Sequence, residues 1–148
     1  ETSMFKSIAM SNYGEGPFVK AVLMGRSPIT AAFKGSYFKQ LSDEGKLPKA
    51  FADKFGSTPD KFFIAAPELK KEYGDRFKEI PWEAVAVYTY LTDRIGVGLR
   101  QLLAGNRKWK LELVSRNDLM SLSERAAKVT GIPTADEVEK DAIEKILG

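Results

Sequence analysis

Residues 81–105 read PWEAVAVYTYLTDRIGVGLRQLLAG, and this stretch decides the fold. Apolar side chains recur along it every three or four positions, which is the period of one face of an α-helix. They are Trp82, Val85, Tyr88, Leu91, Ile95, Leu99 and Leu102. Pro81 suits the first position of a helix and Gly105 lies just beyond its end. We therefore expect one long helix over 81–104, about 35 Å in length, with other helices packed around it.

Shorter helices are expected on both sides of this stretch, because Pro and Gly recur where helices start and stop. Ser27 is a candidate N-cap for a helix to Ser42, with Ile29, Ala32, Phe33, Tyr37 and Phe38 facing inward. Ser121–Glu124 and Thr134–Glu137 match the capping box, which predicts helices to Val129 and Leu147. The remaining expected helices are 5–10, 48–55, 59–66 and 68–73. In the last helix of the chain, Val138, Ala142, Ile143 and Ile146 are expected to face inward.

Residues 109–114, Trp-Lys-Leu-Glu-Leu-Val, alternate between apolar and polar side chains and could form one short strand. Nothing else in the sequence is an obvious pairing partner for it. The predicted fold class is mostly α, a compact bundle of about six to eight helices around the helix 81–104.

Charge divides the chain unevenly. Residues 1–116 carry nineteen Lys and Arg against thirteen Asp and Glu, whereas residues 117–148 carry four against seven. We expect a loosely ordered arm over 1–16, a basic helical body over 17–116, and an acidic helical hairpin over 117–148. The hairpin is expected to pack on the body within a single domain. Its final helix is too acidic to bind phosphate, which argues against a DNA-binding helix-turn-helix at Ala126–Pro133.

The chain contains no cysteine and no histidine. This excludes disulfides, thiol nucleophiles, imidazole acid–base chemistry and the usual zinc ligands. Without these groups the sequence favours a non-enzymatic protein, and it indicates no cofactor and no metal. No signal peptide or transmembrane segment is recognisable, so we expect a soluble protein, cytoplasmic by default, that does not bind a membrane.

The most function-like segment is Gly105–Lys110, in which Arg107, Lys108 and Lys110 surround Trp109. Two further cations, Arg94 and Arg100, precede it on the long helix. Such cations can neutralise phosphates, and an exposed indole can stack on a base. The alternative is structural: Gly105 caps the helix, the cations complement its negative end, and Trp109 belongs to the core.

Two glycine-containing segments are weaker candidates. Arg26 and Ser27, after Gly25, place an arginine beside the free amides of a helix start, which is a candidate anion site. Gly96 and Gly98 interrupt the long helix at a cost of about 2 kcal/mol. Close packing of another backbone is the favoured explanation for them, with a kink or a ligand contact as the alternatives.

Residues 83–100, EAVAVYTYLTDRIGVGLR, resemble the helix that opens the catalytic domain of ADP-ribosyltransferase toxins. Ile95–Arg100 keeps the spacing of that family's Ile-Asn-x-x-Leu-Arg segment, with Gly96 in place of Asn. The resemblance implies NAD binding by an N-terminal or degenerate portion of such an enzyme. The family's Ser-Thr-Ser motif is absent from this sequence.

Together these features predict a helical binding module that uses Arg94, Arg100, Arg107, Lys108, Trp109 and Lys110 to bind nucleic acid or an acidic protein surface. One alternative is a structural or assembly component that forms homo-oligomers. The other is the ADP-ribosyltransferase-like portion.

Overall fold

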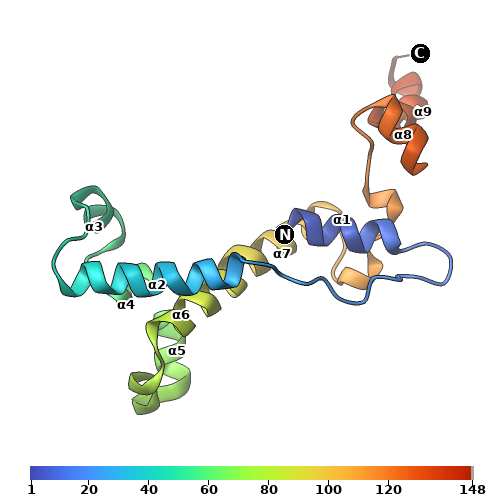
Figure 1. Ribbon diagram of the computed structural model, residues 1–148. Coiled ribbons are helices and arrows are strands. Elements are labelled where there is room, and N and C mark those ends of the chain that lie inside the picture. Colours follow the sequence, from blue (N-terminus) through green and yellow to red (C-terminus); the bar gives the residue numbers. More distant parts are fainter. Residues whose placement is uncertain (148) are drawn as a thin grey trace. The chain divides into compact units, whose positions relative to one another are not determined.

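The structure, a computed structural model, describes residues 1–147, and the side chains of all of these except Asp141 and Ala142. It is mostly α, as predicted (Figure 1). The α-helices are α1 (Thr2–Ser11), α2 (Ser27–Asp43), α3 (Lys49–Phe55), α4 (Pro59–Phe62), α5 (Ala66–Tyr73), α6 (Trp82–Thr89), α7 (Val97–Gly105), α8 (Glu124–Thr130) and α9 (Ala135–Leu147). Three 3-10 helices, η1 (Gly74–Glu79), η3 (Leu111–Leu113) and η4 (Arg116–Asp118), and a π-helical segment, η2 (Tyr90–Gly96), complete the elements.

The predicted strand at 109–114 is wrong. Residues Leu111–Leu113 form the 3-10 turn η3, and residues 1–147 contain no strand. The only β-type pairing among them is an isolated bridge between Ser121 and Thr134. An alternating pattern forms a strand only when another strand pairs with it, and none of the described residues pairs in this way with residues 109–114.

Two compact units divide the chain. The middle unit is Leu23–Gly98, and the terminal unit combines Glu1–Val22 with the chain from Leu99 onwards. The boundaries of these units, after residues 22 and 98, differ from the boundaries after residues 16 and 116 that we expected from the charge distribution. The charge-based division stays a prediction. The helical backbone continues from Trp82 to Gly105 without a break, as expected for the long helix, and the boundary between the units falls within α7.

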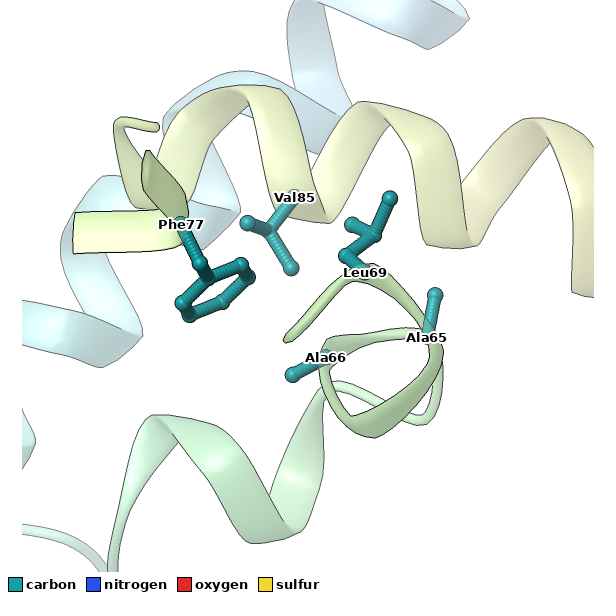
Figure 2. Packing of buried hydrophobic residues seen from close by; sticks show 5 residues of the cluster. All are labelled: Ala65, Ala66, Leu69, Phe77 and Val85. Atoms are coloured by element: carbon teal, nitrogen blue, oxygen red, sulfur yellow. The ribbon is translucent and has the colours of Figure 1, made fainter. Parts of the chain in front are cut away.

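The core of the middle unit lies where α5 and η1 pack against α6. Val85 is fully buried and meets Leu69, Phe77 and the two alanines at the start of α5, Ala65 and Ala66 (Figure 2). Trp82 closes this cluster, since its ring stacks on Phe63 with centroids 5.8 Å apart.

The face of α2 that packs on α6 is only partly the predicted one. Gly35 is the buried residue of α2, and Ala32 and Phe38 on the same side are half-buried, as predicted. Ile29, Phe33 and Tyr37, also predicted to face inward, are 57–72% exposed. A Cβ added at Gly35 would lie 2.5 Å from the Cβ of Ala86. Only a glycine permits this approach. The side of α2 that is buried against α6 is therefore determined by the small residue Gly35, and not by the largest apolar side chains.

Gly96 does not mark a close contact with another element. The nearest atom that an added Cβ would meet is the carbonyl oxygen of Leu91, in the same helix. Gly96 instead ends the π-helical segment, in which the backbone is wound more loosely than in an α-helix. The close-packing explanation is therefore wrong for Gly96, and the close approach occurs at Gly35.

The terminal unit has a small core of its own. Phe5 and Ala9 of α1 are buried with Val114, and Leu99, Leu102, Leu103 and Leu119 pack against them. In α9 the apolar side chains predicted to face inward are exposed: Val138 by 48%, Ile143 by 42% and Ile146 by 82%. Ala142, also predicted to face inward, lies outside the described side chains.

Candidate nucleic-acid interface

The cationic segment begins at the C-terminal cap of α7. The Lys108 amide donates to the Leu103 carbonyl at 2.9 Å and the Arg107 amide donates to the Ala104 carbonyl at 3.0 Å. This pair of hydrogen bonds forms a Schellman motif, which needs one residue in the left-handed conformation. That residue is Arg107, with φ of 53°, and not Gly105 as the sequence suggested.

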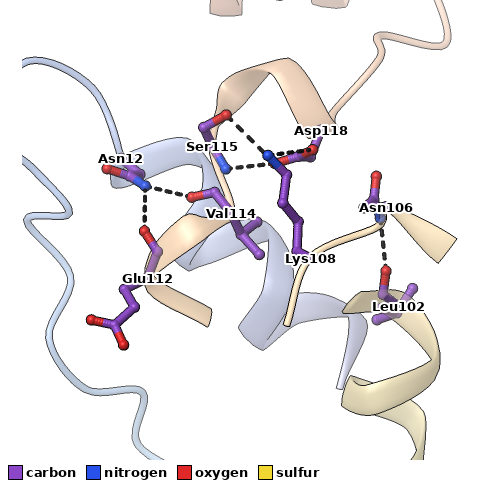
Figure 3. Close-up of polar contacts among 8 residues, drawn as sticks. All are labelled: Asn12, Leu102, Asn106, Lys108, Glu112, Val114, Ser115 and Asp118. Carbon is purple, nitrogen blue, oxygen red and sulfur yellow. Dashed lines mark hydrogen bonds and ion pairs between the residues drawn. The ribbon is translucent and has the colours of Figure 1, made fainter. Parts of the chain in front are cut away.

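The residues that follow the cap are fixed by burial of Val114 and by hydrogen bonds from Asn12. Val114 is fully buried, and the Asn12 side-chain amide donates to the carbonyls of Glu112 and Val114, at 3.1 and 2.6 Å (Figure 3). Asn12 ends α1, so α1 anchors the segment that follows the loop. Residues 106–110 are thus a short loop fixed at both ends, by the cap of α7 and by Asn12.

Trp109 lies on the surface of this loop. Its side chain is 80% exposed, so the interpretation that placed it in the core is wrong. Arg107 and Lys110 on either side of it are exposed as well. Arg100 is exposed on α7. The terminal unit therefore carries three exposed cations and an exposed indole on α7 and the loop that follows it.

Lys108 differs from its neighbours because it is half-buried and has an anionic partner. Its ammonium lies 3.8 Å from a carboxylate oxygen of Asp118 (Figure 3). The same carboxylate accepts a hydrogen bond of 2.8 Å from the Ser115 amide and so caps η4. Lys108 thus links the loop to η4, which makes it the least available of the predicted cations.

Arg116, the first residue of η4, also has its partners within the terminal unit. Its Nε donates to the Met10 carbonyl at 3.0 Å. Its guanidinium lies over the ring of Tyr13, 4.2 Å from the centroid. This cation stabilises the connection between α1 and η4.

Arg94, Arg26 and Ser27 are all exposed and belong to the middle unit, so they are not part of this loop. The backbone of Arg26, not Ser27, is the N-cap of α2, and no side chain caps that helix. The expected cap at Ser27 is therefore displaced by one residue. The role of Arg26 and Ser27 in anion binding stays a prediction.

Sequence reasoning missed the pocket that Arg94 lines. It has a volume of about 430 Å³, and its walls come from α2, α3, α4, α6 and η2. One signal in the sequence pointed to it. Seven of the nine phenylalanines fall between residues 33 and 77, and Phe38, Phe51, Phe62 and Phe63 line the pocket.

Among the described residues no group of acidic side chains is arranged to hold a metal ion. In the same part of the chain, no helix combines the length and the apolar character needed to cross a bilayer. Comparisons with protein-family models, with curated proteins and with solved structures found no match for this chain.

Proposed function

We propose that the protein is a binding module whose loop 106–110 binds single-stranded nucleic acid. Trp109 supplies a stacking surface for one base, and Arg107 and Lys110 neutralise the phosphates on either side of it, with Arg100 extending the cationic surface. The exposure of Trp109, at 80%, is the observation that carries the proposal. A large aromatic ring held on the surface between two cations by an anchored loop matches what single-strand binders use.

An acidic protein surface is the other partner that this charge would attract. Nucleic acid is favoured over it because a flat ring between exposed cations suits a base between two phosphates. Stacking is also tolerant of sequence, so the proposed binding is sensitive to salt and not selective for one base order.

The test is fluorescence anisotropy of labelled single-stranded and duplex oligonucleotides at two salt concentrations. We expect tighter binding of the single strand. Replacing Arg107 and Lys110 together by Gln should weaken binding and reduce the slope of log K against log salt by about 0.7 for each phosphate that the protein no longer neutralises. Trp109→Ala should cost about 1–3 kcal/mol of binding free energy, and Trp109→Phe should retain part of it.

Arg125→Gln with Lys128→Gln is the matched control, because both cations are exposed on α8 of the same unit. This variant should bind nearly as tightly as the wild type. Equal losses in the two double variants would show that net charge alone attracts the oligonucleotide. Binding to poly-glutamate without binding to the oligonucleotide would replace the proposal with an acidic protein partner.

The assembly alternative has one supporting observation, the exposed apolar stripe of Ile29, Phe33 and Tyr37 on α2. It predicts self-association at micromolar concentration, measurable by sedimentation velocity. The ADP-ribosyltransferase-like alternative predicts thermal stabilisation by NAD.

A further inference from the structure

We propose that the phenylalanine-lined pocket of the middle unit is a binding site for a small apolar organic anion, an aryl or acyl carboxylate. The pocket lies within Leu23–Gly98, so the proposal is independent of the loop that carries the proposed nucleic-acid interface. It rests on the shape of the pocket, on the charges at it, and on the π-helical segment that forms one wall.

The pocket is large enough for such a ligand. Its volume of about 430 Å³ falls within the range of about 300–1,000 Å³ that is usual for small-molecule sites. Phe38 and Phe51 stack with their centroids 4.8 Å apart, and Phe62 lies 5.7 Å from Phe51. Because these rings already pack on one another, they form a continuous apolar wall that an acyl chain or an aromatic ring can cover.

The charges at the pocket favour an anion. Lys34 from α2 and Arg94 from η2 both line it and are exposed, so their charged ends can reach a carboxylate at its mouth. Asp93 is the one acidic side chain among the described lining residues. Aromatic walls can also bind a quaternary ammonium group, but two cations against one carboxylate oppose that ligand.

Two helical segments that line this pocket, η2 and α2, have unusual local features. Tyr90, Asp93 and Arg94 all come from η2, and π-helical turns inside α-helices occur frequently at functional sites. Gly35, which also lines the pocket, allows α2 to approach α6, because a Cβ there would lie 2.5 Å from the Cβ of Ala86. A buried glycine of α2 and the π-helical segment η2 therefore line the same cavity.

The test is isothermal titration calorimetry of the full chain with 2-naphthoate and with decanoate. Each carboxylate is compared with a neutral alcohol of similar shape: 2-naphthalenemethanol for 2-naphthoate and 1-decanol for decanoate. We expect at least one carboxylate to bind about tenfold more tightly than its analogue. Lys34→Gln with Arg94→Gln should remove that preference, whereas Lys49→Gln with Lys71→Gln, exposed cations outside the pocket, should preserve it.

NMR of alanine methyl groups locates the ligand in the wild-type protein, so this measurement does not depend on the folding of a variant. The methyls of Ala31 and Ala86, which line the pocket, should shift on addition of the carboxylate, and the methyl of the exposed Ala50 should not. Equal affinity for acid and alcohol, shifts confined to other alanines, or tighter binding of benzyltrimethylammonium would each overturn the proposal. Oligonucleotide binding should be unchanged in the Lys34→Gln, Arg94→Gln variant, which separates this site from loop 106–110.

Discussion

Arg107 occupies a backbone conformation that usually belongs to glycine. With φ of 53°, it takes the left-handed position of the α7 cap, next to the exposed Trp109. A left-handed conformation costs a residue with a Cβ about 1–2 kcal/mol. Strained positions of this kind occur at sites where a side chain is needed for function. Arg107 is therefore the residue at which stability and binding should conflict.

Arg107→Gly should move these two properties in opposite directions. We expect it to stabilise the terminal unit by about 0.5–1 kcal/mol, since glycine adopts positive φ without steric cost. It should also weaken oligonucleotide binding, since it removes a cation. Chemical denaturation and anisotropy measure the two effects. Arg107→Ala separates the two effects, because alanine removes the charge but still has a Cβ at a left-handed position. It should weaken binding without stabilising the unit, and a stabilised Ala variant would contradict the assignment of backbone strain to Arg107.

At this scale the sequence located the loop but not its conformation. The cations around Trp109 and the end of the helix near Gly105 follow from residue types and spacing. The left-handed residue falls two positions after Gly105 because the hydrogen bonds of Lys108 and Arg107 set the cap there. The exposure of Trp109 was undecided by sequence, because an indole suits both a core and a stacking surface.

Among the elements, α2 and α6 show how a small residue determines packing. The face of α2 that carries Gly35 lies against α6, and the larger apolar side chains Phe33 and Tyr37 are exposed. Periodicity predicted a helix here nearly to the residue. It wrongly placed Ile29, Phe33 and Tyr37 on the buried side, because it weights positions by hydrophobicity and not by how closely two backbones can approach.

Gly35→Ala tests this packing. The added methyl group would overlap Ala86, so α2 must move away from α6, and we expect a loss of about 1–3 kcal/mol in unfolding free energy. Gly25→Ala is the control, because an added Cβ there meets nothing within 4 Å. Its effect should stay within about 0.5 kcal/mol. Trp82 fluorescence in a Trp109→Phe background follows the middle unit, and equal stability of both variants would refute the close approach.

The capping box that starts α9 was predicted from sequence and is present. Glu137 accepts hydrogen bonds from the Thr134 amide at 2.7 Å and from its hydroxyl at 3.0 Å. These two bonds, the amide first, lower the pKa of the Glu137 carboxyl below its usual value. A lowered pKa means that the cap is fully formed above the unfolded-state pKa and is lost as the pH falls through the folded-state pKa.

Acid titration followed by NMR measures this effect at a single residue. The Thr134 amide resonance should move as Glu137 becomes protonated, with a midpoint below that of an unperturbed glutamate. Glu137→Gln should abolish this transition, and Glu139→Gln, which removes the same charge from the same helix outside the cap, should leave it in place. A transition that survives Glu137→Gln would assign it to another carboxyl.

For the whole molecule, the central feature is the division into two compact units with separate cores. The mostly α fold class was predictable, because helical periodicity and end signals are local properties of the sequence. The division was not, because its terminal unit joins residues 1–22 to the chain beyond residue 98, and packing between such distant segments leaves no periodic signal. The phenylalanine-lined pocket was missed for the same reason, since four separate segments after residue 30 build its walls.

Each unit contains one of the two tryptophans, Trp82 in the middle unit and Trp109 in the terminal unit. Their surroundings differ, since Trp82 stacks on Phe63 and Trp109 is 80% exposed. A fluorinated tryptophan at both positions therefore gives each unit its own NMR reporter.

The most direct test of the proposed function is ¹⁹F NMR of protein labelled with 5-fluorotryptophan, with the resonances assigned by Trp109→Phe. On addition of an oligo-thymidine strand at low salt, the Trp109 resonance should shift, Trp82 should not, and added salt should reverse the change. If Trp109 stays unmoved while the oligonucleotide binds, or if no binding occurs at low salt, loop 106–110 is not a nucleic-acid interface.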